Sequence, residues 1–232
     1  MSFLANVFNQ SWQVGPLAIN EGTMLVSWLV MLILVVLGLV AGRQVSVENP
    51  RGLQNAFEAI FDFVGGFIES SGGEQSWVIW ELLVTMILFL AFANWIGLVP
   101  GLHSPTANLS VTLGMALLVF LLTIYHGVRV HGIGGWLLHF FKPQAWLFPI
   151  NLIEELAKPI TLSMRLFGNI FAGEVLIDTL LKLMPLRTYP FLITVAVQVV
   201  WLGFSVFVGA IQAFIFMMLS LIYVSTSMAH EH

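Results

Sequence analysis

Cysteine is absent from this chain of 232 residues, and charged residues make up only 9% of it. Without cysteine the chain can form neither a disulfide nor a thiolate metal site. Soluble globular domains carry about a quarter charged residues, so the scarcity of charge excludes an ordinary soluble domain. Hydrophobic residues account for 59% of the chain and extend over almost its whole length. We therefore expect a single integral membrane domain, residues 1–232, surrounded by lipid.

Motifs of nucleotide-binding and metal-dependent enzymes are absent as well. The sequence holds no Gly-rich loop ending in Lys-Ser/Thr, no His-Glu-x-x-His helix and no Gly-x-Ser-x-Gly elbow. We expect the chain itself to bind no nucleotide, nucleic acid, metal or cofactor.

The first half of the chain contains apolar runs that are long enough to span a membrane, with other segments between them. Residues 22–42 are uncharged and long enough to cross ~30 Å of hydrocarbon as a helix. Residues 46–70 mix apolar and acidic side chains at helical spacing, which predicts an amphipathic helix on the membrane surface. Residues 78–128 contain two further apolar runs separated by PGLHSPTAN, which predicts a helical hairpin. Residues 131–146 are short and interrupted by glycine and proline, so we expect them at the membrane interface.

The last part of the chain contains unusually long apolar runs. Residues 188–228 hold no charge, and as one helix they would be roughly 60 Å long, about twice the hydrocarbon thickness. They form either two spans or one oblique helix, and the lack of a central turn cluster favours the oblique helix. Residues 146–182 are similarly long and end at the turn sequence MPLRTYP. The predicted fold is an all-α integral membrane protein with about five membrane-crossing helices. Its last two helices form a long, strongly tilted hairpin, and an amphipathic helix lies on the surface.

Basic residues in the loops predict the orientation. Five of them follow the first and third spans, namely Arg43, Arg51, Arg129, Lys142 and Lys158. The amino-terminal segment and the 101–108 turn have none, and only Lys182 and Arg187 lie on that side. We expect the amino terminus outside and the carboxyl terminus in the cytoplasm, in a bacterial plasma membrane.

The stretch ITLSMRLFGNIFAGEVL, residues 160–176, carries charges inside an apolar run. A charge at mid-membrane costs ~3 kcal/mol on insertion scales, so it needs a partner, water or a function. Arg165 and Glu174 lie nine residues apart, about 13 Å along a helix and on opposite sides of it, so they cannot pair directly. Arg165 is thus either paired elsewhere in the chain or a functional charge. Glu154 and Lys158 have i, i+4 spacing and are interpreted as a structural pair.

Further polar residues fall at helical spacing from these charges. Asn169 follows Arg165 by one turn, and Asp178 follows Glu174 by one turn. The two polar patches lie at different depths, which suggests two separate aqueous routes.

The final helix carries a polar stripe of small and amide residues, Gln198, Ser205, Gly209 and Gln212. Close helix packing through small residues and pore lining are both consistent with it. Gln212 favours pore lining, because its amide has four hydrogen-bond positions to satisfy. Four other polar residues near span ends are interpreted as interfacial rather than mechanistic: Glu81, Asn94, His126 and His139.

The segment FPINLIEELAKPITLSMRLFGNIFAGEVL, residues 148–176, resembles the signature of subunit a of the F-type ATP synthase. The core of that signature is Arg-Leu-x-Gly-Asn-x-x-Ala-Gly, which corresponds to residues 165–173 here. Residues 93–101 (ANWIGLVPG), 104–113 (SPTANLSVTL) and 211–223 (IQAFIFMMLSLIY) are also similar to the family. The resemblance covers nearly all of the chain from the second span onward.

The resemblance implies a stator subunit that carries protons past a rotating ring of c subunits, with peripheral-stalk b subunits as further partners. The essential arginine of the family corresponds to Arg165, which keeps the ring carboxylate ionised and separates two offset half-channels. Polar residues of the inlet half-channel correspond to Asn169, Glu174 and Gln212. A position that is often titratable in the family corresponds to Ser205, which cannot titrate near neutrality. The tilted hairpin would pack against the c ring.

Two other classes of function stay open from the residues alone. A secondary transporter, or an ion-translocating subunit of a redox complex, would use a buried Arg and Glu within one chain. Such transporters usually contain internal repeats with matching helix breaks, and the sequence shows neither. A structural scaffold would explain the apolar composition but not Arg165 and Glu174.

Overall fold

The computed structural model describes residues 11–14, 17–43, 52–72, 74–99, 102–141, 144–183 and 191–229. These residues form an all-α architecture with one short β-hairpin near the amino terminus. Strands β1 (Ser11–Val14) and β2 (Leu17–Asn20) pair antiparallel, with Ser11 opposite Asn20. The sequence analysis predicts no strand here, because four-residue strands are too short for a hydrophobic period to be recognised.

Helix α2 (Glu21–Arg43) covers the first apolar run. Asn20 caps its start, since the side-chain Oδ1 accepts hydrogen bonds from the backbone N–H groups of Gly22 at 2.9 Å and Thr23 at 3.3 Å. Glu21 lies in the first turn and Arg43 in the last, where each charge complements the helix dipole. The hairpin therefore leads directly into a capped helix.

Helix α3 (Leu53–Phe67) continues into a π-helical turn, Ile68–Gly72 (η1), and a 3-10 turn, Glu74–Ile79 (η2). It begins after Gly52, whose φ of 64° is not helical. The predicted surface helix starts earlier, at residue 46, but residues 46–51 lie outside the described part of the chain. Val64 and Ile68 are buried while Asp62 and Glu69 are exposed, so α3 and its extension are amphipathic.

Helices α4 (Trp80–Ile96) and α5 (Leu109–His139) are connected through the 3-10 turn η3 (Pro105–Ala107). Asn108 caps α5 by accepting a hydrogen bond from the N–H of Ser110 at 3.0 Å. Its amide also donates to Thr23 Oγ1 at 3.3 Å, which ties this loop to α2. Helical backbone continues beyond the predicted end at residue 128 as far as His139, but it is interrupted at Gly132, where a φ of 72° and a ψ of 166° are not helical. The interruption that the glycines of this segment predict is therefore present.

The chain ends in two long helices, α6 (Phe148–Leu183), preceded by the 3-10 turn η4 (Ala145–Leu147), and α7 (Phe191–Met228). The turn predicted between them, at residues 184–190, lies outside the described residues. Helix α7 is one continuous helix of 38 residues rather than two. Its tilt in a membrane stays a prediction.

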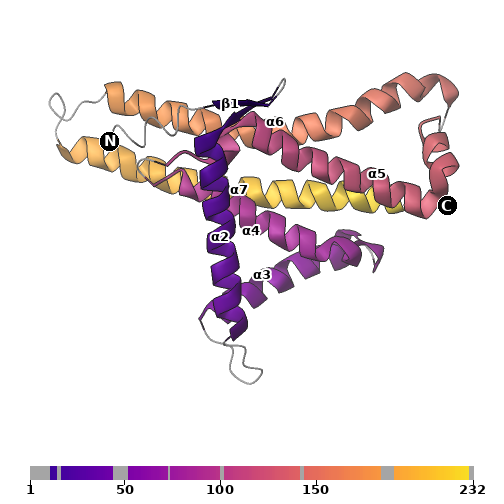
Figure 1. Cartoon of the computed structure of the whole chain (residues 1–232), viewed down its shortest axis with the longest axis horizontal. Helices are drawn as coiled ribbons and strands as arrows, with labels where there is room; N and C mark the ends of the chain where they lie inside the picture. Colours follow the sequence, from indigo (N-terminus) through magenta and orange to yellow (C-terminus); the bar gives the residue numbers. More distant parts are fainter. Residues whose placement is uncertain are drawn as a thin grey trace.

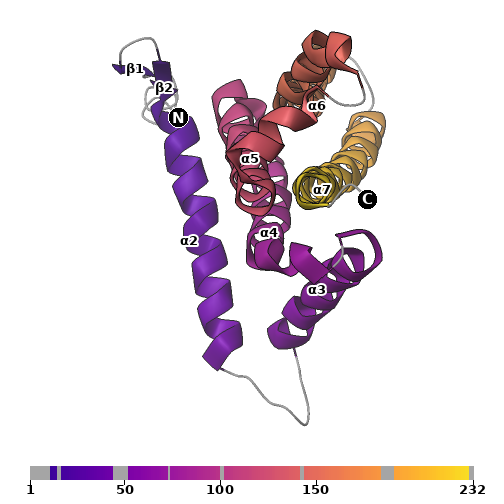
Figure 2. The same cartoon turned by 90° about the vertical axis from the view of Figure 1, so that its right-hand side faces the viewer.

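The helices cross one another rather than forming a parallel bundle. In Figure 1, α2 runs across the long axis along which α6 and α7 extend, and Figure 2 shows α7 beside α4, α5 and α6. One apolar core joins α3, η1 and η2 to α4 and the second half of α7. A second core joins α4, α5, α6 and α7, and consists of Met86, Leu90, Ala116, Val119, Leu162, Leu166, Ala213 and Phe216.

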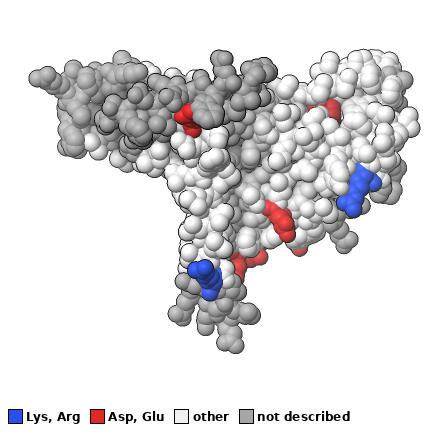
Figure 3. Space-filling model, in the orientation of Figure 1, with Lys and Arg blue, Asp and Glu red and all other residues white. Residues whose placement is uncertain are grey.

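Within the described residues, four helices are long and apolar enough to cross a membrane: Glu21–Arg43, Ser76–Ile96, Leu109–Leu138 and Val195–Met228. Figure 3 shows few charged side chains on the described surface in that view. The prediction of an all-α integral membrane protein is confirmed. Five crossings would require α6 as the fifth, and that number stays a prediction.

Candidate functional site

The side chain of Arg165 is exposed on α6, at the edge of the buried face of the helix. Leu162, one turn before it, and the adjacent Leu166 are buried in the second core, whereas Arg165 and Met164 are exposed. No ion pair or hydrogen bond joins the Arg165 guanidinium to any other residue that the structure describes. The helix thus presents a cation on an apolar surface without a partner from the described chain.

The other polar residues predicted on α6 follow Arg165 along one continuous helix. Asn169 is exposed one turn further on. Glu174 and Asp178 lie in the helical backbone, but their side chains fall outside the described part of the structure. Because α6 is unbroken between Arg165 and Glu174, the rise of about 13 Å stands, and the two residues cannot pair directly.

Gln212 on α7 is buried, with 7% of its surface exposed. Its side-chain amide forms no hydrogen bond with any other described residue, and a buried amide without partners costs about 1–3 kcal/mol. Leu166 of α6 and Ala213 of α7 both belong to the second core, and they are the sequence neighbours of Arg165 and Gln212. Ser205 is half-buried on α7, about 10 Å from Gln212 along the helix axis. Arg165 and Gln212 thus each lie next to a residue of the same core, and Ser205 lies about two turns from Gln212.

The polar stripe on α7 packs closely against α4 at Gly209. A Cβ atom at this position would lie 3.1 Å from Asn94 Cβ and 3.3 Å from Trp95 Cδ1. Of the two interpretations of the stripe, close helix packing is therefore observed at Gly209. Gln212, the next member of the stripe, is the one that lacks a hydrogen-bond partner among the described residues.

Asn94 is a residue whose importance the sequence analysis underestimates. It is 4% exposed, so the interpretation as an interfacial residue is wrong. Its Nδ2 donates to the carbonyl of Gly209 at 2.9 Å, and its Oδ1 accepts from Thr106 Oγ1 at 2.6 Å. The neighbouring Trp95 donates from Nε1 to the carbonyl of Val206 at 3.0 Å. The partners Gly209 and Val206 lie more than 100 residues away on α7, so no local sequence pattern could indicate them.

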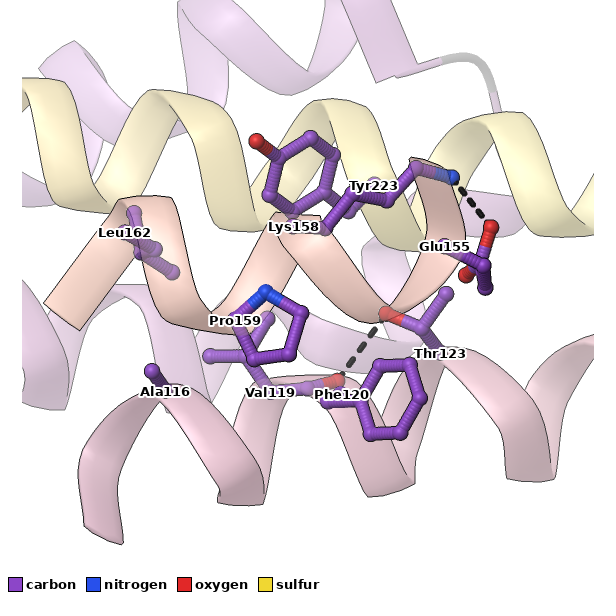
Figure 4. Close-up of a pocket in the computed structure, with 9 residues that line it drawn as sticks. All are labelled: Ala116, Val119, Phe120, Thr123, Glu155, Lys158, Pro159, Leu162 and Tyr223. Carbon is purple, nitrogen blue, oxygen red and sulfur yellow. Dashed lines mark hydrogen bonds and ion pairs between the residues drawn. The ribbon is translucent and has the colours of Figure 1, made fainter. Parts of the chain in front are cut away.

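Lys158 pairs with Glu155, not with Glu154 as predicted. Lys158 Nζ lies 2.5 Å from Glu155 Oε2, while Glu154 is exposed. Figure 4 shows the pair beside a pocket between α5, α6 and α7, with Lys158 near the ring of Tyr223 at 5.7 Å from its centroid. Both spacings place a glutamate on the same side of the helix as Lys158, and only Glu155 is turned toward this pocket.

Where their side chains are described, the other polar residues noted from the sequence are not grouped into a second site. His126 is buried, and its Nδ1 lies 2.9 Å from the carbonyl of Leu122 within the same helix. Glu81 is exposed, and the side chain of His139 lies outside the described residues. In the part of the chain that the structure describes, no three His, Asp or Glu residues are grouped so as to hold a metal ion.

Comparison with known proteins identifies the family of the chain. The sequence model of the ATP synthase A chain family matches residues 24–225. ATP synthase subunit a of Desulforamulus reducens is 41% identical over 225 residues, covering 97% of this chain and 86% of that protein. ATP synthase subunit a of Lysinibacillus sphaericus is 34% identical over 229 residues, covering 95% and 97%. The Staphylococcus saprophyticus subunit is 38% identical over 240 residues, covering 96% and 97%. The resemblance of residues 148–176 is thereby confirmed, and the chain belongs to the ATP synthase subunit a family.

Proposed function

We propose that this chain is the proton-translocating stator subunit of an ATP synthase and that Arg165 is its fixed charge opposite the carboxylates of a rotating c ring. Membership of the family places the chain in the membrane-embedded Fo sector of an ATP synthase. The c ring as partner, the half-channels and the role of Arg165 are the parts that we propose.

The observation that carries the proposal is the exposure of Arg165 on an apolar surface. Met164 is 50% exposed and Phe171 is 47% exposed on the same helix, so the arginine lies among side chains suited to lipid or to another membrane protein. An unpaired charge in such surroundings costs ~3 kcal/mol or more. Because no described residue pairs with Arg165, a carboxylate on another subunit is the partner that best offsets this cost.

The positions of the polar residues support two offset water routes. Gln212 is buried next to the core that α6 and α7 share, without a hydrogen-bond partner in the described chain, and water is the partner that would satisfy its amide. We assign Asn169, Glu174, Gln212, Ser205 and Asp178 to the half-channels. A ring carboxylate receives a proton from the inlet and releases it to the outlet, since the nearby guanidinium favours the ionised carboxylate. The same positive charge repels protons that would pass directly between the half-channels.

A single-chain transporter fits the arrangement less well. Such a protein would hold its charged residues around a cavity inside the bundle. Arg165 instead is exposed on α6, at the edge of the face that buries Leu162 and Leu166. This placement favours a partner outside the chain.

We further propose that the amino terminus faces outside and the carboxyl terminus faces the cytoplasm, with b subunits of the peripheral stalk as additional partners. Arg43 ends α2 and Arg129 lies near the bend of α5, which places both on the cytoplasmic side in this orientation. Because the chain has no cysteine, one introduced cysteine near each terminus would report its side through a membrane-impermeant maleimide. Labelling from the opposite sides would contradict the orientation.

The function is tested with Arg165→Ala in the complete reconstituted ATP synthase. We expect loss of ATP-driven proton pumping while the complex still assembles, and a raised passive proton leak after the catalytic part is removed. Arg129→Ala, which removes an exposed arginine of α5, is the matched control and should leave coupled pumping intact. Unchanged pumping in Arg165→Ala would show that the arginine is structural and would contradict the proposal.

A further inference from the structure

We propose that Asn94 is a positioning residue for proton uptake, which fixes the height of α7 against α4 and thereby the depth of Gln212. The effect on proton flux rests on the function proposed above. The effect on the position of α7 rests on the geometry alone, so the two parts can be tested separately.

The first evidence is a pair of side-chain hydrogen bonds from α4 to the backbone of α7. Asn94 Nδ2 donates to the carbonyl of Gly209 at 2.9 Å, and Trp95 Nε1 donates to the carbonyl of Val206 at 3.0 Å. The two carbonyls are three residues apart and therefore lie on the same side of α7. A shift of α7 by one residue would move each carbonyl by ~1.5 Å and rotate it by about 100°, which breaks both bonds.

The second evidence is the absence of a side chain at Gly209. A Cβ atom there would lie 3.1 Å from Asn94 Cβ, which is tighter than an ordinary contact between side chains. Only glycine lets the last turn of α4 approach the backbone of α7 this closely. The contact is thus specific for one position along α7, because the positions beside Gly209 carry side chains.

The third evidence is a buried polar network that orients the Asn94 amide. Thr106 Oγ1 donates to Asn94 Oδ1 at 2.6 Å, and Ser104 Oγ donates to the carbonyl of Ala93 at 2.8 Å. The two hydroxyl oxygens lie 2.7 Å apart, and Thr106 is completely buried. Because Thr106 occupies Oδ1, Nδ2 must face α7. A flipped amide would place Oδ1 against the carbonyl of Gly209, without a hydrogen between the two oxygens.

The consequence concerns Gln212, which follows Gly209 by almost one turn. Both residues therefore lie on nearly the same side of α7, and the height of one sets the height of the other. Gln212 has no hydrogen bond to a described residue, so its own side chain does not hold α7 in place. Asn94 acts from a distance, by fixing the height at which α7 holds the Gln212 amide.

The experiment measures the position of α7 by cross-linking, in the complete ATP synthase in membranes. The chain has no native cysteine, so Leu166→Cys and Ala213→Cys, both in the second core, are introduced together, and any cross-link between α6 and α7 must join these two positions. Asn94→Ala or Thr106→Val is then added. We expect the cross-link yield to fall about fivefold, the shift in population that accompanies loss of one hydrogen bond to α7.

Matched variants separate positioning from a general loss of stability. Thr123→Val makes the same substitution at another buried threonine, whose Oγ1 donates only to Val119 within α5 at 2.9 Å. It should leave the cross-link unchanged, and Thr106→Ser, which retains the hydroxyl, should restore it. Passive proton flux through Fo, measured without the cysteines, should fall in Asn94→Ala and Thr106→Val and should stay normal in Thr123→Val and Thr106→Ser.

Each outcome decides one part of the proposal. An unchanged cross-link in Asn94→Ala and Thr106→Val overturns the positioning of α7. A lost cross-link with unchanged proton flux overturns the link to proton uptake. Normal pumping by Arg165→Ala would contradict the proposed function instead, and it would leave the cross-linking result standing as evidence on the height of α7.

Discussion

The side-chain amide of Asn94 donates a 2.9 Å hydrogen bond to the carbonyl of Gly209, 115 residues later in the chain. Gly209 lacks the Cβ atom that would otherwise lie against Asn94 and Trp95. A polar side chain and a missing side chain thus form one contact between α4 and α7. Glycine at position 209 is therefore required for the packing of α7 against α4.

Gly209→Ala is expected to destabilise the protein. The added methyl group overpacks the contact with Asn94 and Trp95, which costs about 1–3 kcal/mol and outweighs the gain of about 1 kcal/mol in helix propensity. Thermal unfolding of the purified chain in detergent measures the net effect. Gly203→Ala, where a Cβ would meet nothing within 4 Å, should be neutral or stabilising. Equal stability of the two variants would mean that α4 and α7 are not in close contact at Gly209.

The pair Glu155 and Lys158 is expected to show a coupling energy of about 1 kcal/mol, between the values for exposed and buried ion pairs. The side chains are 16% and 27% exposed, respectively, so solvent screens the pair only in part. A double-mutant cycle with Glu155→Gln and Lys158→Met, followed by thermal unfolding, isolates this coupling. The same cycle with Glu154→Gln should give a value near zero. A larger coupling for Glu154 would restore the pairing predicted from the sequence.

The apolar runs predicted the long helices well, because their length and lack of charge depend on no distant contact. The sequence His-Gly-Ile-Gly-Gly predicts a break, and the non-helical backbone at Gly132 agrees with it. The return to helix after Gly132, as far as His139, was not predicted. The prediction that Lys158 pairs with Glu154 was also wrong. Two adjacent glutamates offer equivalent spacing, and only the packing of α6 against α5 and α7 decides between them.

For the candidate site too, some residues could be predicted from the sequence and others could not. Arg165 could be predicted from sequence, because a charge in an apolar run is costly wherever it lies. Asn94 could not, because an asparagine near the end of a span has the same local sequence whether it faces water or a helix backbone. Its burial depends on Thr106, Ser104 and Gly209, and the contact with Gly209 exists only after the fold has formed.

Gly132→Ala is expected to cost about 1–3 kcal/mol of stability, because the backbone there has φ 72° and ψ 166°, a region that essentially only glycine adopts. Thermal unfolding in detergent measures the loss. Gly134→Ala is the matched control, since Gly134 has no positive φ and a Cβ there would meet nothing within 4 Å. If both variants unfold at the same temperature, the bend in α5 does not require glycine.

Glu174→Gln is expected to slow proton uptake without preventing assembly. Glutamine keeps the size and hydrogen-bonding capacity of the side chain but cannot exchange a proton, so the residue can no longer relay protons in the inlet half-channel. We expect passive flux through Fo to fall about tenfold, less than the 10²–10⁴-fold that a positioned proton-transfer group contributes in enzymes, because water in the channel can replace part of the relay.

The matched control for this prediction is Glu81→Gln, which neutralises an exposed glutamate in the first turn of α4. It should conduct protons normally, because it lies outside the proposed half-channels. Flux is measured on membranes from which the catalytic part has been removed, after the amount of assembled Fo has been equalised. Normal flux in Glu174→Gln would remove Glu174 from the inlet. Proton uptake would then depend on water held by Asn169, Gln212 and Ser205, whose side chains form hydrogen bonds but do not ionise near neutral pH.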